Sequence, residues 1–64
     1  KWRVVFTEHE FCHILAGRMT VQRDDEEAVE LTAGSAAYFP IGWTGIWTVV
    51  EPVRKLYVVY KPEA

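Results

Sequence analysis

The sequence predicts an all-β domain in which short antiparallel strands form a sandwich or a barrel. Runs of β-branched and aromatic residues alternate with turn signals along the chain, which is typical of antiparallel strands. No window of about a dozen residues keeps apolar positions at helical spacing between plausible helix caps. About seven such runs fit into 64 residues, and this density of strands and turns favours a sandwich or barrel.

Turn residues mark where these strands should end. Ala-Gly at 16–17 predicts a tight connection, because glycine adopts a positive φ without steric cost. The acidic stretch 24–27 predicts a solvated hairpin tip, and Pro40 should end a strand because it lacks an N–H. Prolines in the pairs 51–52 and 61–62 should break or end the last two strands. The expected strands are 2–6, 10–15, 18–23, 28–31, 36–39, 44–50 and 53–60.

Length, charge and cysteine content narrow the class of protein. The 64 residues allow one domain, and because the chain begins at Lys1 we expect it to be the C-terminal part of a longer chain. Cys12 is the only cysteine, which excludes an internal disulfide and favours a cytoplasmic protein. The net charge of −2 argues against nucleic acid as a partner, and no apolar run of about 18 residues predicts a membrane span.

Two spacings in the chain resemble the signature of the cupins. Glu10 is followed after six residues by Gly17, as in the first cupin motif. Gly34, Pro40 and Gly42 keep the second motif, which runs glycine, five residues, proline, one residue, glycine. The two motifs occur in the right order, so the chain resembles a cupin domain.

The end of the chain narrows this resemblance. Trp47 and the segment 51–57 (Glu-Pro-Val-Arg-Lys-Leu-Tyr) are similar to a small cupin subgroup that includes ureidoglycine aminohydrolase-like and ethanolamine-utilisation proteins. The resemblance implies a single cupin domain over residues 1–64. It also implies a jelly-roll barrel or sandwich of about seven short antiparallel strands, without the N-terminal strands of full-length members.

The chain departs from the metal-binding cupins at the expected ligands. Those proteins place a His-X-His pair shortly before the motif glutamate and a third histidine after the second motif. Here no such pair precedes Glu10, and the third position falls on Gly45. We therefore predict no cofactor and no histidine metal site. A divalent metal held by Glu10, Cys12 and an outside ligand is the alternative.

Glu10 is the candidate catalytic residue. On a strand, Glu10 and Cys12 share one face, and the resemblance implies that this face lines the barrel. A buried carboxylate needs a partner. Glu10 therefore either forms a structural pair with a basic group, or binds a ligand, or acts as an acid or base in a reaction. Arg54 and Lys55 alternate in direction, so one of them should point inward beside Glu10. Cys12, without a histidine on its face, is interpreted as a small buried hydrophobe.

Aromatic side chains from several strands could line a pocket for a planar or sugar-like ligand, or could fill the core. His13 lies on the face opposite Glu10, so we expect it to be packed or at a dimer interface. His9 should be solvated in a turn. The predicted ligand-binding residues are Glu10, Cys12, Tyr38, Trp47, Arg54 and Tyr57, and Trp43 and Tyr60 are further aromatic candidates.

Three functions are compatible with these observations. The first is a metal-independent cupin that binds a small metabolite in its barrel. The second, implied by the resemblance, is a hydrolase or lyase of a small nitrogen-containing metabolite, with Glu10 as acid or base. The third is a non-catalytic dimerisation or interaction module, which a small core and exposed strand edges favour. We expect a homodimer that binds a small metabolite.

Overall fold

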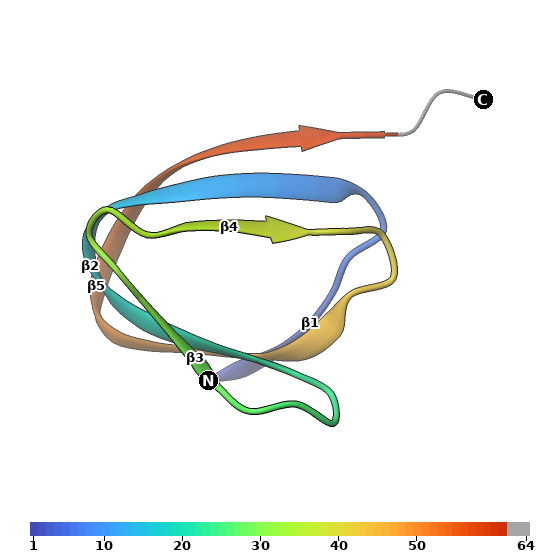
Figure 1. The fold of residues 1–64 in the computed structure, drawn as a ribbon, viewed down its shortest axis with the longest axis horizontal. Helices are drawn as coiled ribbons and strands as arrows, with labels where there is room; N and C mark the ends of the chain where they lie inside the picture. Colours follow the sequence, from blue (N-terminus) through green and yellow to red (C-terminus); the bar gives the residue numbers. More distant parts are fainter. Residues whose placement is uncertain (62–64) are drawn as a thin grey trace.

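The computed structural model describes residues 1–61, and within this range the chain forms strands and turns without a helix. The elements are β1 (Trp2–Val5), β2 (His9–Arg23), β3 (Val29–Thr32), β4 (Ala36–Phe39) and β5 (Thr44–Tyr60), as Figure 1 shows. The predicted all-β class is confirmed. Pro62, which we expected to help end the last strand, lies outside the described residues. In residues 1–61 there is no helix that could cross a membrane.

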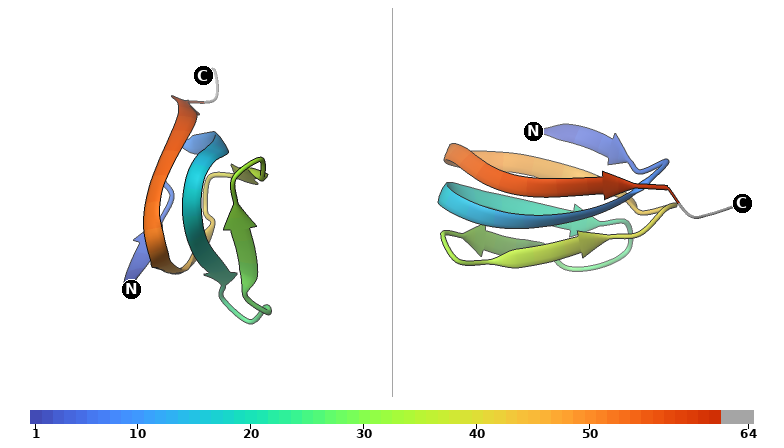
Figure 2. Two further views of the ribbon diagram at one scale, coloured as in Figure 1. Left: turned by 90° about the vertical axis from the view of Figure 1, so that its left-hand side faces the viewer. Right: turned by 90° about the horizontal axis from the view of Figure 1, so that it is seen from above.

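The two long strands β2 and β5 form the centre of the fold. They pair antiparallel along most of their length, from His9 opposite Tyr60 to Arg23 opposite Gly45. The sheet order is β1-β5-β2-β3, and β4 pairs with the first part of β2, so that neighbouring strands lie side by side in Figure 2. Because both long strands bend near their middle, the sheet folds back into two facing layers (Figure 1).

We expected a tight turn at 16–17 and a strand break at 51–52. Both predictions are wrong, because the chain continues through both places as a bent strand. The pairing of β2 with β5 shifts register between Ile14 and Met19, and such a bulge bends a strand. Gly17 has a φ of 92° and lies so close to β5 that a Cβ there would overlap the carbonyl oxygen of Pro52. Pro52 has no N–H to donate to a neighbouring strand. Within residues 1–61, β1 pairs with β5 only at 44–47, so no hydrogen bond between β1 and β5 is lost at Pro52. Two pairs of expected strands therefore merge, and five strands replace about seven.

The core lies between the two layers. Phe6, just after β1, stacks on Phe39 with ring centroids 5.0 Å apart, and Trp43 meets Phe39 edge-on at the same distance. Each buried aromatic ring removes a large apolar area from water, which helps so short a chain to hold two layers together. The buried hydrophobic residues are Cys12, Ile14, Met19, Val21, Leu31, Phe39, Trp43 and Trp47.

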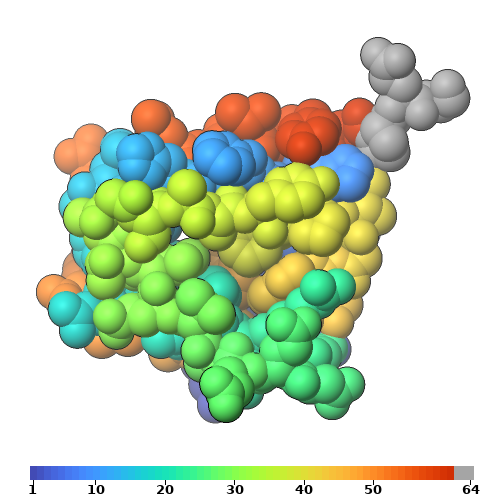
Figure 3. Space-filling view, in the orientation of Figure 1, coloured from blue at the N-terminus to red at the C-terminus, as the bar shows by residue number. Residues whose placement is uncertain are grey.

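The acidic hairpin tip between β2 and β3 is exposed at 24–27, as we expected, and the hairpin is tied down at its base. The carboxylate of Asp24 accepts hydrogen bonds from Arg3 Nη2 at 2.7 Å and from the Thr44 hydroxyl at 2.5 Å. These hydrogen bonds, of which the one from Arg3 has the largest effect, hold the pKa of Asp24 below its ordinary value. Asp24 thus joins β1, β2 and the start of β5, while the rest of the hairpin projects from the body in Figure 3.

Candidate functional site

An ion pair lies between the two layers. Glu10, near the start of β2, is 8% exposed and is the buried charged residue of the described part of the chain. Lys55 on β5 is opposite Ile14, on the same face as Glu10, and its Nζ donates a hydrogen bond to Glu10 Oε2 at 3.3 Å. A carboxylate buried without a partner would be costly, so this contact is what allows Glu10 to lie inside. Of the two basic residues expected beside Glu10, the structure therefore places Lys55 there, and Arg54 is exposed.

Aromatic rings hold the Lys55 ammonium in place. Its Nζ lies 4.4 Å from the ring centroid of Trp47 and 5.5 Å from that of Tyr57. A cation over an aromatic face is attracted by the ring quadrupole, and the attraction grows where water is excluded. The Lys55 side chain is 22% exposed, so most of it is covered by its neighbours.

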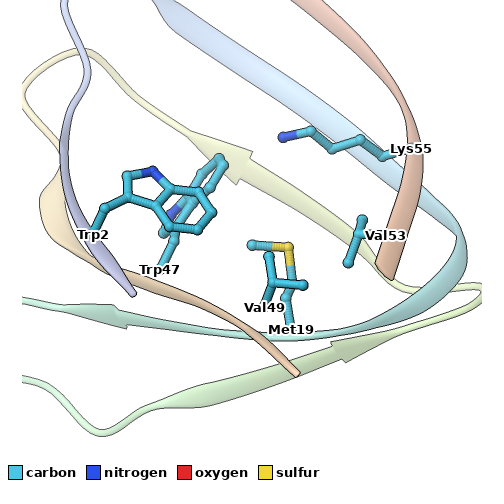
Figure 4. Close-up of a pocket in the computed structure, with 6 residues that line it drawn as sticks. All are labelled: Trp2, Met19, Trp47, Val49, Val53 and Lys55. Carbon is cyan, nitrogen blue, oxygen red and sulfur yellow. The ribbon is translucent and has the colours of Figure 1, made fainter. Parts of the chain in front are cut away.

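An open pocket of about 150 Å³ lies beside this ammonium. Its walls come from β1, β2 and β5, and Figure 4 shows the Lys55 side chain reaching across the pocket toward the two tryptophans. Trp2 packs edge-on against Trp47 with ring centroids 6.1 Å apart. The lining residues are Trp2, Met19, Trp47, Val49, Val53 and Lys55.

Trp47 contributes a second polar group to this region. Its indole Nε1 is buried and has no hydrogen-bond partner among residues 1–61. A buried donor that lacks an acceptor is unusual, because almost all such groups in folded proteins are paired. The Trp47 N–H thus lies beneath the surface of the pocket, and the Lys55 ammonium is the charged donor of its lining.

Cys12 is buried below the ion pair, on the same face of β2 as Glu10. Burial raises the pKa of the Cys12 thiol, while the charge of Lys55 acts in the opposite direction and Glu10 adds to the increase. At neutral pH the side chain is therefore a thiol, which suits the expected small hydrophobe and not a nucleophile. Cys12 does not line the pocket, so a part in ligand binding stays a prediction.

The structure brings together some of the predicted ligand-binding residues and separates others. Glu10, Trp47 and Tyr57 all surround the Lys55 ammonium. Tyr38 lies opposite Phe11 on the outer face of the sheet, away from this pocket. Arg54 is exposed and does not line the pocket either.

Several lining residues were missed at the level of sequence. Met19 could have been found, because the alternation along 18–23 places it on one face with the buried Val21. Trp2 reaches the pocket through the pairing of β1 with β5, which sets Trp2 opposite Trp47. A pairing so distant along the chain has no local signal in the sequence.

The two histidines lie away from the ion pair, and our expectation for His9 is wrong. His9 begins β2 and stacks between Tyr38 and Tyr60, with ring centroids at 5.9 and 5.1 Å. The backbone N–H of Ile41 donates to His9 Nδ1 at 3.3 Å, so this nitrogen is an acceptor, and the Tyr38 hydroxyl donates to it at 2.9 Å. His13 is exposed on the outer face.

The residues around Glu10 do not fit the metal centre of the metal-binding cupins. Within residues 1–61, no group of three or more His, Cys, Asp or Glu side chains is arranged to hold a metal ion. The cationic group that contacts Glu10 is the Lys55 ammonium. At this position Lys55 and Glu10 offer a hydrogen bond and a charge pair.

Comparison with known proteins agrees with the fold and the motifs. Residues 1–57 match the family described as the EutQ-like cupin domain. The fold is similar to the crystal structure of a DUF861 family protein from Thermotoga maritima, with a TM-score of 0.86 and 32% sequence identity over 92% of this chain and 67% of that chain. None of the curated proteins matches the sequence. The expected cupin fold is confirmed, and the chain belongs to the EutQ-like cupin family.

Proposed function

We propose that this small cupin binds a small metabolite in the pocket between its layers, without a resident metal. One observation carries the proposal: a single charged group, the Lys55 ammonium, lines an otherwise apolar pocket in the described part of the chain. Concave apolar sites with a few well-placed polar groups are the usual form of small-molecule sites. Lys55 would fix the orientation of the ligand, and the apolar walls would supply most of the contact.

Glu10 supports this function indirectly. It holds Lys55 at 3.3 Å and does not itself line the pocket. Lysine loses about 2 kcal/mol of rotamer entropy when it is fixed, so a lysine already held in place binds a ligand at lower cost. This arrangement favours binding over the alternative in which Glu10 acts on a substrate as an acid or base.

The proposal is tested with uniformly ¹⁵N-labelled protein dialysed against EDTA. We expect benzene-sized fragments, taken as an acidic, a neutral and a basic set, to include binders that shift the indole N–H resonances of Trp2 and Trp47. The indole of Trp43, which does not line the pocket, serves as the internal reference. Binding that appears only after a divalent metal is added, or no binding at all, would contradict the proposal.

A filled pocket gives a second test. Val49→Phe adds volume inside the pocket, whereas Val50→Phe adds the same volume at the adjacent exposed position. We expect the first variant to lose fragment binding and the second to keep it. Equal binding by both variants would place the site elsewhere.

We also propose that the protein is a homodimer, because a second apolar surface lies on the outer face of the sheet. A hollow of about 390 Å³ lies there among the side chains of Phe11, His13, Leu56 and Val58. Tyr57 also borders it, although its ring lies near Lys55 on the inner face. Among these five residues there is no Asp, Glu, Lys or Arg, so the surface can meet its own copy across a two-fold axis without repulsion between like charges.

Sedimentation equilibrium tests the dimer. Leu56→Asp should give a monomer, because it would bring two carboxylates into a two-fold contact. Val50→Asp, which adds the same charge at an exposed position outside the hollow, should leave the assembly unchanged. A wild-type protein that is monomeric at high concentration would overturn this proposal.

A further inference from the structure

We infer that the ligand of this pocket is a small organic acid: an apolar body about the size of a benzene ring, carrying one carboxylate that accepts a hydrogen bond from Lys55. The inference rests on the proposed function, since it names the class of molecule that the pocket would bind. It follows from the hydrogen-bonding character, the size and the charge of the lining.

The polar side-chain groups of the pocket are donors. Among the six lining residues that the structure describes, Lys55 has an ammonium and Trp2 an indole N–H, whereas the indole N–H of Trp47 is buried beneath the pocket surface. Met19 adds a thioether, which is only a weak acceptor. A complementary ligand must therefore present an acceptor, and an amine or another pure donor would find no strong side-chain partner on these walls.

The volume of the pocket suits a small apolar group. An apolar cavity of about 150 Å³ in another protein binds benzene, and the pocket here is of the same size. Its apolar wall is formed by Met19, Val49 and Val53, which suit a ring or a branched alkyl group. Sugars and nucleotides carry many polar groups that these side chains cannot satisfy.

The charge of the site selects a carboxylate over a phosphate. The Lys55 ammonium has three N–H donors, and the contact with Glu10 Oε2 engages one of them. Glu10 already balances the charge of Lys55, and no second cation lines the pocket within residues 1–61. A phosphate monoester carries a charge of about −1.5 to −2 and would find no second cation here to balance it. A singly charged carboxylate leaves less charge unbalanced. A carboxylate gains a charge–charge attraction to Lys55 that a neutral carbonyl lacks, and repulsion from the Glu10 carboxylate offsets part of that gain.

Three probes of matched shape test this inference: benzoate, benzamide and benzylammonium, each titrated into ¹⁵N-labelled metal-free protein. We expect benzoate to bind about tenfold more tightly than benzamide, and benzylammonium not to bind, with shifts at the Trp2 and Trp47 indoles. In Lys55→Met the preference for benzoate over benzamide should disappear while benzamide still binds. The double variant Glu10→Leu/Lys55→Met serves if the single variant does not fold, and Lys61→Met is the matched control for loss of a surface lysine.

The outcomes separate this inference from the function on which it rests. Equal affinity for benzoate and benzamide, or unchanged preference in the Lys55 variants, would overturn the acid as ligand class and leave the pocket as a binding site. Tighter binding of benzylammonium would overturn it too, because the pocket would then respond to the Glu10 carboxylate. Failure of all three probes would contradict the proposed function together with the inference.

Discussion

The two faces of the sheet formed by the start of β2 and the end of β5 differ in an instructive way. The inner face carries the Glu10–Lys55 ion pair, whereas the outer face exposes Phe11, Leu56 and Val58. A sheet with one buried face usually shows the reverse, with apolar side chains inside and polar ones outside. Burying an ion pair costs desolvation free energy, and exposed apolar patches commonly mark interaction sites. The contrast therefore supports a ligand on the inner face and a second copy on the outer one.

The largest effect should come from the bend that brings the two layers together. We expect Gly17→Ala to lower the free energy of unfolding by about 4 kcal/mol, because the new Cβ adds strain at a positive φ and overlaps Pro52. Gly34→Ala has the same kind of φ but open space around the Cβ, so it should cost about 1 kcal/mol. Urea denaturation measures both, and equal losses would show that close contact at the bend is unimportant.

Breaking the ion pair on the inner face should have the next largest effect. Lys55→Met leaves Glu10 buried without its partner, and we expect a loss of about 3 kcal/mol in unfolding free energy. Glu10→Leu/Lys55→Met removes both charges and should recover most of that loss. If the double variant is no more stable than the single one, the pair contributes through packing and not through its charges.

Truncating one hydrophobic side chain on each face compares the faces directly. Ile14 is fully buried, so Ile14→Ala should cost about 3 kcal/mol through lost burial and the cavity left behind. Leu56 is 63% exposed, so Leu56→Ala should cost about 0.5 kcal/mol or less when the protein is measured as a monomer. A large cost at Leu56 that depends on protein concentration would show that the dimer covers this face.

The smallest effect concerns the Cys12 thiol. Because burial raises the pKa of Cys12, the folded state keeps the thiol proton at pH values at which the unfolded state releases it. This contribution to stability is fully present below the unfolded pKa of about 8.5 and is lost as the pH rises through the folded pKa, with a slope of at most about 1.4 kcal/mol per pH unit.

Cys12→Ala should remove that part of the pH dependence. In the wild-type protein, iodoacetamide at pH 8 should modify Cys12 much more slowly than it modifies a thiol in a short peptide. Modification at the rate of the peptide would show that the inner face is open to solvent.

Much of the fold followed from local patterns in the sequence. The spacing of Glu10 with Gly17, and of Gly34 with Pro40 and Gly42, pointed to the cupin family, which residues 1–57 match. The strand count failed because Ala-Gly and Glu-Pro normally mark turns. In this protein a bulge and the close approach of Gly17 to Pro52 keep both long strands continuous. Only the pairing of distant segments decides between a turn and a bend.

The site was predicted in part. The resemblance to the cupins placed Glu10 inside, and strand alternation left Arg54 and Lys55 as its candidate partners. The register of β2 with β5 decides for Lys55. Tyr38 was a candidate because its aromatic character suits a pocket, but its strand position sets it on the outer face. Residue type thus indicated the chemistry, while strand register decided which side chains meet.

We propose that Lys55, held by Glu10, takes the ligand in a metal-free pocket. The most direct test of this proposal is a crystal structure of the protein grown from EDTA-treated material and soaked with benzoate. We expect a benzoate oxygen within about 3 Å of Lys55 Nζ, with the ring against Met19 and Val53. A metal ion bound at Glu10 with Lys55 turned away, or benzoate bound elsewhere with this pocket empty, would contradict it.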